Sequence, residues 1–157
     1  MYKRLLVLAL AVLLGAATSV LMVLYVGLKQ VRQTERAIIQ EATRNNWLTT
    51  VTETAVYAGE NEYRIAKGLD SQGREKWVWF NEDELYETFS AGLLSAEDAL
   101  NEARRLYPEG RIVRLTPGLF KQRPVWVIFL QERPAQQYVY LYLQMTDGTV
   151  IRELKLH

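Results

Sequence analysis

The feature that most limits this chain is an uncharged apolar segment near its start. Residues Leu5 to Leu28 contain no Asp, Glu, Lys or Arg. A helix needs roughly 20 apolar residues to cross the hydrocarbon core of a bilayer, so this segment is long enough to span it with some tilt. We therefore expect a transmembrane helix over residues 5–28, with the rest of the chain beside a membrane.

A cleaved secretory leader is the main alternative interpretation of this segment. Lys3 and Arg4 supply a basic start, and Gly15–Ala17 is similar to a cleavage site. The apolar character nevertheless resumes at Val20 and continues to Leu28, which a cleaved leader does not need. An uncleaved signal-anchor is therefore favoured, and a buried helix of a soluble protein would need a larger protein around it.

Charge does not decide the orientation of the segment. Two basic residues precede it, and Lys29, Arg32 and Arg36 follow it closely, so the positive-inside rule is nearly balanced. Long domains translocate largely regardless of their charge. We therefore expect residues 1–4 to form a short cytoplasmic tail and the C-terminal domain to lie outside the cytoplasm, in a single-pass protein of the cell membrane.

Composition argues against several classes of function. Acidic and basic residues nearly balance after residue 28, whereas a nucleic-acid footprint or a polybasic lipid surface needs clustered basic charge. The chain has no cysteine, and its single histidine is His157. This excludes disulfides, zinc thiolate sites and internal histidine triads. We predict no catalytic residue, no cofactor, no metal site, no nucleic-acid partner and no small-molecule substrate.

One acidic cluster could be interpreted as an enzyme site. Glu82, Asp83, Glu84 and Glu87 supply carboxylates of the kind that cleave glycosidic bonds. Consecutive acidic residues at a junction between elements are much more often a solvated linker. The sequence therefore favours a protein that is not an enzyme.

In the first half of the chain that follows residue 28, the sequence predicts a helix followed by strands. Apolar residues over Lys29 to Trp47 keep partly to helical spacing, and Asn45-Asn46 predicts the helix end. Strand-like runs follow at 48–57, 62–67 and 76–80, separated by turn residues. Residues 81–92 are acidic and less regular, and we expect them to form a junction.

The second half repeats this order. Ser95 predicts a helix N-cap with Asp98 three residues later, and Pro108 with Gly110 predicts the helix end. Strand-like runs follow at 111–115, 125–131 and 137–145, and Asp147-Gly148 predicts a hairpin turn into 150–156. The chain is therefore expected to be α+β, with each helix packed on an antiparallel meander.

The two halves also match in residue type at a constant offset of 61 positions. Without a gap, this offset places Val51 on Ile112, Ile65 on Trp126, and Trp77–Phe80 on Tyr138–Leu141. Chance similarity between two helix-meander units remains an alternative. We interpret the match as a tandem repeat of one fold, with a first unit at 29–88 and a second at 89–157.

Alternation in the strands separates an aliphatic face from an aromatic face. The aliphatic side chains are expected to face the helix. The aromatic side chains either pack within and between the two units or form a surface for a protein partner, since Trp and Tyr often anchor interfaces. The candidate interaction surface consists of Trp77, Trp79, Tyr138, Tyr140 and Tyr142.

The second unit resembles the PepSY domain. The resemblance is carried by LLSAEDALNEARRLYPEG from Leu93 to Gly110, by VWVIFL, and by the final YVYLYLQMTDGTVI. Together with the single membrane helix and the first unit, which is similar to DUF5590, the whole chain resembles the YpmB/TseB family of Gram-positive bacteria. Arg123-Pro124 stands where the family usually has a glycine, so the second hairpin departs from the pattern.

The resemblance implies two tandem cystatin-like units and a non-enzymatic regulator of cell wall elongation. Its implied partner is a penicillin-binding protein or another component of cell wall synthesis, and its implied influence is on peptidoglycan synthesis and cell shape. PepSY domains are also linked to protease inhibition. An inhibitor or chaperone of extracytoplasmic proteases is therefore the alternative function.

Overall fold

The computed structural model describes residues 22, 25–27, 29–133 and 137–156. The predicted transmembrane helix over 5–28 lies outside the described residues, except for 22 and 25–27. Among the residues described, no helix is both long and apolar enough to cross a membrane. By internal contacts the chain divides into residues 1–37 and residues 38–157, and each part is considered by itself.

The first helix ends where the asparagine pair predicts. Residues 29–44 are helical, and those from 29 to 37 are exposed. Asn46 takes the left-handed conformation, with φ of 57°. The amides of Trp47 and Leu48 then donate to the carbonyl of Ala42 at 3.0 and 3.2 Å, which satisfies a carbonyl left free at the helix end.

The first sheet is a four-stranded antiparallel meander in the order β1-β2-β3-β4. Its strands are β1 (Thr50–Ala58), β2 (Glu62–Leu69), β3 (Glu75–Phe80) and β4 (Leu85–Phe89). Ile38 and Ala42 of the helix form a small core with the sheet residues Ala66, Val78 and Phe80. The prediction that aliphatic positions of the meander face the helix is confirmed here.

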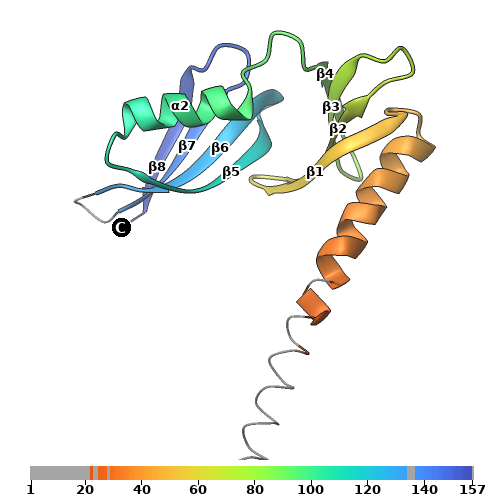
Figure 1. Ribbon diagram of the computed structural model, residues 1–157, viewed down its shortest axis with the longest axis horizontal. Coiled ribbons are helices and arrows are strands. Elements are labelled where there is room, and N and C mark those ends of the chain that lie inside the picture. Colours follow the sequence, from red (N-terminus) through yellow and green to blue (C-terminus); the bar gives the residue numbers. More distant parts are fainter. Residues whose placement is uncertain (1–21, 23–24, 28, 134–136, 157) are drawn as a thin grey trace, which may run out of the picture. The chain divides into compact units, whose positions relative to one another are not determined.

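The second sheet follows helix α2 (Ala96–Leu106) and has the same order, β5-β6-β7-β8. Its strands are β5 (Arg111–Phe120), β6 (Arg123–Gln131), β7 (Tyr138–Gln144) and β8 (Val150–Leu156). Figure 1 shows α2 lying along one face of this sheet. Ala99 and Ala103 are the buried residues of α2. Because their side chains are small, the helix can lie close to the strands.

The predicted α+β architecture of helices on two antiparallel meanders is confirmed, but the prediction that residues 81–92 form only an irregular junction is wrong. These residues contain strand β4, which pairs with β3 from Phe80↔Leu85 to Lys76↔Phe89. Asn81 accepts hydrogen bonds from the amides of Asp83 and Glu84 and closes the turn. The strand was missed because its segment is acidic. Edge strands often carry charged side chains, which prevent pairing with a further strand.

The tandem repeat is also visible in the strand register. β1 has a bulge between Val51 and Glu53, and β5 has one between Ile112 and Arg114, 61 positions later. Beyond the bulge, the offset between equivalent residues of the two repeats becomes larger than 61. Gly68 and Leu130, which face the bulges, are 62 apart, and their partners on the next strand, Lys76 and Val139, are 63 apart.

This growth corrects the ungapped match. Trp77–Phe80 corresponds in register to Tyr140–Leu143 rather than to Tyr138–Leu141. Ile65 and Trp126 are not equivalent, because the extra position moves the second strand by one residue and so exchanges its two faces. The second repeat is therefore longer than the first by one position at each of its first two hairpin turns, where insertions are tolerated.

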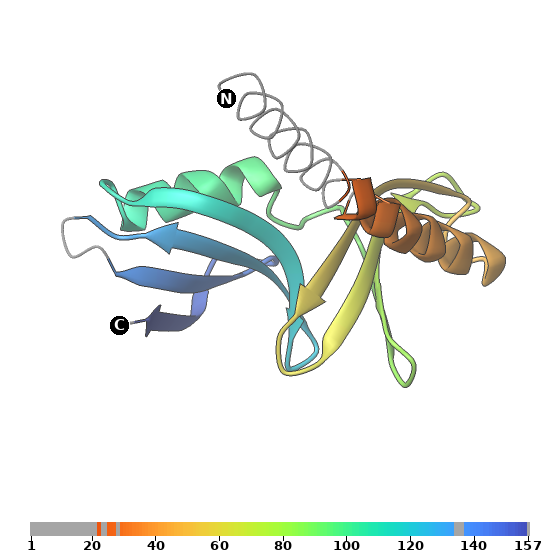
Figure 2. The same ribbon diagram turned by 90° about the horizontal axis from the view of Figure 1, so that it is seen from below.

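The hydrophobic core of the second sheet extends to the first sheet. It includes Tyr57, Trp77 and Trp79 of the first sheet together with Trp126 and Leu141 of the second. Strands β1 and β5 contact each other near the ends of the β1–β2 and β5–β6 hairpins, which Figure 2 shows side by side. Both sheets therefore share buried apolar contacts within residues 38–157.

Candidate interaction groove

A groove of about 490 Å³ lies on the face of the second sheet that is opposite α2. Val56–Glu60, from the β1–β2 hairpin, form one wall. The floor is formed by alternate side chains of all four strands of the second sheet: Arg114, Thr116, Val127, Phe129, Tyr140, Tyr142, Arg152, Leu154 and Leu156. We call this set the groove. It is partly open to solvent, and its volume is within the range of typical ligand sites.

Stacked aromatic rings form the centre of the groove floor. The ring centroids of Phe129 and Tyr140 are 4.7 Å apart, and those of Phe129 and Tyr138 are 5.2 Å apart, in stacked orientations. We call these three rings the aromatic platform. Neighbouring rings fix one another in position, so the platform offers an apolar surface at a small cost in side-chain entropy.

Tyr57 joins the hairpin wall to the floor. Its ring lies over Gly118 of β5, where an added Cβ atom would be 3.0 and 3.1 Å from two ring carbons. The absence of a side chain at position 118 is what makes room for the ring. Burial and a hydrogen bond with the Tyr142 hydroxyl raise the pKa of Tyr57, so this phenol stays protonated.

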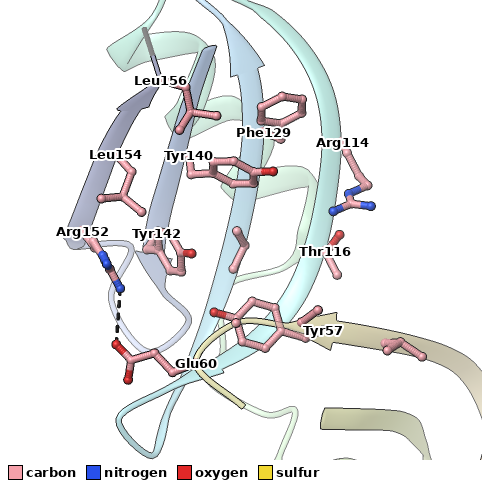
Figure 3. Close-up of a pocket in the computed structure, with 14 residues that line it drawn as sticks. Tyr57, Glu60, Arg114, Thr116, Phe129, Tyr140, Tyr142, Arg152, Leu154 and Leu156 are labelled. Atoms are coloured by element: carbon pink, nitrogen blue, oxygen red, sulfur yellow. Dashed lines mark ion pairs between the residues drawn. The ribbon is translucent and has the colours of Figure 1, made fainter. Parts of the chain in front are cut away.

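Arg152 is held in place by rings on one side and by Glu60 on the other. Its guanidinium carbon lies 5.2 Å from the centroid of the Phe120 ring and 5.7 Å from that of Tyr142. Its Nη1 atom is 3.6 Å from Glu60 Oε1, the pair marked in Figure 3. A long, partly exposed pair of this kind contributes less than about 1 kcal/mol, and Glu60 can move away at little cost.

Arg114 faces the groove because of the bulge in β5. Residues two apart on a regular strand share a face, but Ile112 pairs with Leu130 whereas Arg114 pairs with the next residue, Phe129. The extra residue Val113 therefore turns Arg114 away from the face of Ile112 and onto the groove face, where Figure 3 shows it. Within the described part of the chain, Arg114 makes no ion pair.

The structure divides the candidate interaction surface that the sequence suggested. Trp77 and Trp79 are 6% and 0% exposed, and the Trp77 ring meets Trp126 edge-on at 5.8 Å. These two residues are therefore part of the core and cannot form a surface of the folded chain. Tyr140 and Tyr142 line the groove, but Tyr142 is only 7% exposed and also belongs to the core. Tyr138 extends the platform at its exposed end, 41% exposed.

The remaining wall and floor residues were not identified from the sequence. The Arg152, Leu154 and Leu156 alternation in the last strand was a signal that could have found part of them. Tyr57 and Glu60 had no local signal, because they come from the other repeat.

Two members of the acidic cluster have structural partners. The hydroxyl of Tyr63 donates to Glu84 Oε2, and Lys76 Nζ is 2.9 Å from Glu87 Oε2. These contacts link β4 and its turn to the neighbouring strands. Among the residues described, no group of three or more acidic or histidine side chains is arranged to hold a metal ion.

Comparison with known proteins gives a structural match. The chain matches the YpmB protein from Bacillus subtilis with a TM-score of 0.68, over 77% of this chain and 96% of that one, at 18% sequence identity. In fold, this chain resembles YpmB. A DUF2874 family protein from Bacteroides uniformis matches with a TM-score of 0.40 over 76% and 88% of the two chains, at 19% identity. Neither a protein-family model nor a curated protein matches the sequence.

The likeness to YpmB concerns the fold. It extends over about three quarters of this chain and nearly the whole of the YpmB chain. The fold with two four-stranded antiparallel sheets therefore resembles that of YpmB.

Proposed function

We propose that this chain is a membrane-anchored, non-enzymatic regulator that acts outside the cytoplasm by binding another protein. The observation that carries this proposal is the groove, which combines exposed apolar side chains, stacked rings and two arginines. Leu156 is 47% and Val56 is 40% exposed at its edges. Aromatic residues and arginine are the residue types that contribute most to binding energy at protein interfaces.

The partner that we propose is a penicillin-binding protein or another component of cell wall synthesis, and the process is cell wall elongation. The YpmB-like fold and the resemblance of the sequence to the YpmB/TseB family support this choice. The membrane helix expected over residues 5–28 also supports it. Two proteins held in one membrane have a high effective concentration, so a weak contact at an open groove is sufficient.

Crosslinking in intact cells tests this function. Cells that produce the tagged full chain are treated with a membrane-permeable crosslinker, and the captured proteins are identified by mass spectrometry. We expect a penicillin-binding protein among them, and a change in cell width or length when the gene is deleted. Normal cell shape together with no captured protein of wall synthesis would contradict the proposed function.

Protease shaving of whole cells tests the proposed location separately. The C-terminal domain is expected to be degraded in intact cells, because it lies outside the cytoplasm. If it is degraded only after the cells are lysed, the orientation is the reverse of the one we propose.

Inhibition or chaperoning of extracytoplasmic proteases is the second candidate. It is favoured by β8, which ends the second sheet and carries the exposed apolar residues Val150 and Leu156. An edge strand can pair with a strand of a partner or enter its cleft. An assay of the full chain against secreted proteases separates the two candidates, since only the second predicts inhibition or assisted folding of the protease.

A further inference from the structure

The two repeats differ at the position where the bulge turns a charged side chain onto the face opposite the helix. In the first sheet this residue is Glu53, and it pairs with Lys67 Nζ at 3.3 Å. In the second sheet the equivalent residue is Arg114, and the residue facing it is Phe129. The bulge therefore places an internal ion pair in the first repeat. In the second repeat it places a guanidinium that has no acidic partner among the described residues.

The surroundings of Arg114 suit a carboxylate on an apolar body. Its guanidinium offers a planar set of donors that matches a carboxylate in two parallel hydrogen bonds. Thr116 lies two residues further along β5, on the same groove face, and supplies a hydroxyl. The aromatic platform lies beside them, since Phe129 faces Arg114 directly in the strand register.

The shape of the groove favours a stretch of polypeptide as its occupant. The floor runs across four strands, and the groove has exposed apolar residues at its edges, Val56 in the wall and Leu156 in the floor, so it does not enclose a small molecule. Arg114 and Arg152 stand on opposite outer strands of the sheet, and Glu60 compensates only Arg152. Of the two groove arginines, Arg114 is thus the one without an acidic partner among the described residues.

We propose that the groove binds an extended acidic peptide segment of a partner protein. A carboxylate of the peptide binds Arg114, and an adjacent aromatic or aliphatic side chain lies on the aromatic platform. This inference rests on the proposed function, because it names the contact surface and the partner chemistry of the same interaction.

A peptide selection tests this inference directly. A random peptide library displayed on phage is selected on the full chain, purified in detergent, and in parallel on the Arg114→Gln variant. We expect the wild-type selection to enrich Asp or Glu next to Tyr, Phe or Leu. A selection that enriches nothing, or that enriches peptides without a carboxylate, would overturn the inference.

Binding of one selected peptide is then measured by fluorescence anisotropy. Arg114→Gln is expected to weaken binding about tenfold, which corresponds to the loss of one hydrogen bond between charged groups. Exchanging the acidic residue of the peptide for its amide is expected to weaken wild-type binding similarly and to have little further effect on the variant. Arg104→Gln on α2 is the matched control, because Arg104 is exposed and lies on the helix, away from the groove.

Equal binding by the two arginine variants would show that Arg114 does not hold the carboxylate. Peptide binding without capture of a wall-synthesis protein in cells would remove the proposed function and leave the groove inference. If the Arg114→Gln variant captures the wall-synthesis protein in cells as well as wild type does, the proposed function would stand and the groove inference would be overturned.

Discussion

Asp70, in the turn between β2 and β3, is a buried carboxylate with several donors around it. Its Oδ1 atom accepts from the amides of Gln72 and Arg74 at 2.8 and 3.0 Å, and its Oδ2 atom pairs with the Arg74 guanidinium at 2.9 Å. The pKa of Asp70 is held below its ordinary value mainly by the hydrogen bond from the backbone amide of Arg74, and the Arg74 side chain lowers it further. The carboxylate therefore stabilises the folded chain most when it is ionised.

The resulting prediction concerns pH. Because the folded-state pKa is lowered, the contribution of Asp70 is complete above the ordinary aspartate pKa of about 3.9 and is lost as the pH falls through the lowered folded value. Asp70→Asn should lower the Tm near neutral pH, and its melting curve should converge with that of wild type in acid. Thermal unfolding at a series of pH values measures this, with the exposed Glu82→Gln as control. A Tm difference that is the same at every pH would count against this account.

At the scale of single elements, Ser95 begins α2 as the sequence predicted. Its Oγ atom accepts from the amide of Asp98 at 3.1 Å. Ser95→Ala should lower the free energy of unfolding by about 1 kcal/mol, because a free amide donor of the first turn loses its partner. Ser95→Asn is the matched control, since asparagine caps helices equally well. Urea unfolding measures both variants, and equal losses in the two would show that the cap is not what stabilises this end.

The contact between β1 and β5 depends on Gly118. A valine there would collide with the Tyr57 ring and with Val127, and overpacking of this kind costs about 1–3 kcal/mol. We expect Gly118→Val to be less stable than wild type in urea unfolding. Valine has a higher strand propensity than glycine, so without the collision this substitution would be expected to raise the stability. A variant as stable as wild type would mean that Tyr57 does not need the space above Gly118.

At the scale of the whole molecule, the shared core predicts that the two sheets unfold together. Trp77 of the first sheet meets Trp126 of the second edge-on at 5.8 Å. A double-mutant cycle of Trp77→Ala and Trp126→Ala should give a coupling of about 0.5–1.5 kcal/mol. Tryptophan fluorescence and far-UV circular dichroism should follow one transition. Two separated transitions would show that each sheet is stable without the other.

The sequence predicted the elements of this molecule better than its surface. Helix ends at Asn46 and Ser95, and seven of the eight strand positions, follow from local turn chemistry and periodicity. The bulges at Thr52 and Val113 break the alternation by one residue, so strict period-two reasoning places Arg114 on the wrong face. The burial of Trp77 and Trp79 and the wall formed by Tyr57 depend on contacts between repeats, which no local pattern contains.

The groove as a protein contact is the central claim, and site-specific photo-crosslinking in intact cells tests it most directly. A photoreactive amino acid is placed at Leu156, at the open edge of the groove, or at Leu106, at the end of α2, two leucines that are 47% and 38% exposed. We predict a crosslinked penicillin-binding protein or other wall-synthesis protein from position 156 and none from position 106. Equal crosslinking from both positions, or none from position 156, would contradict the account.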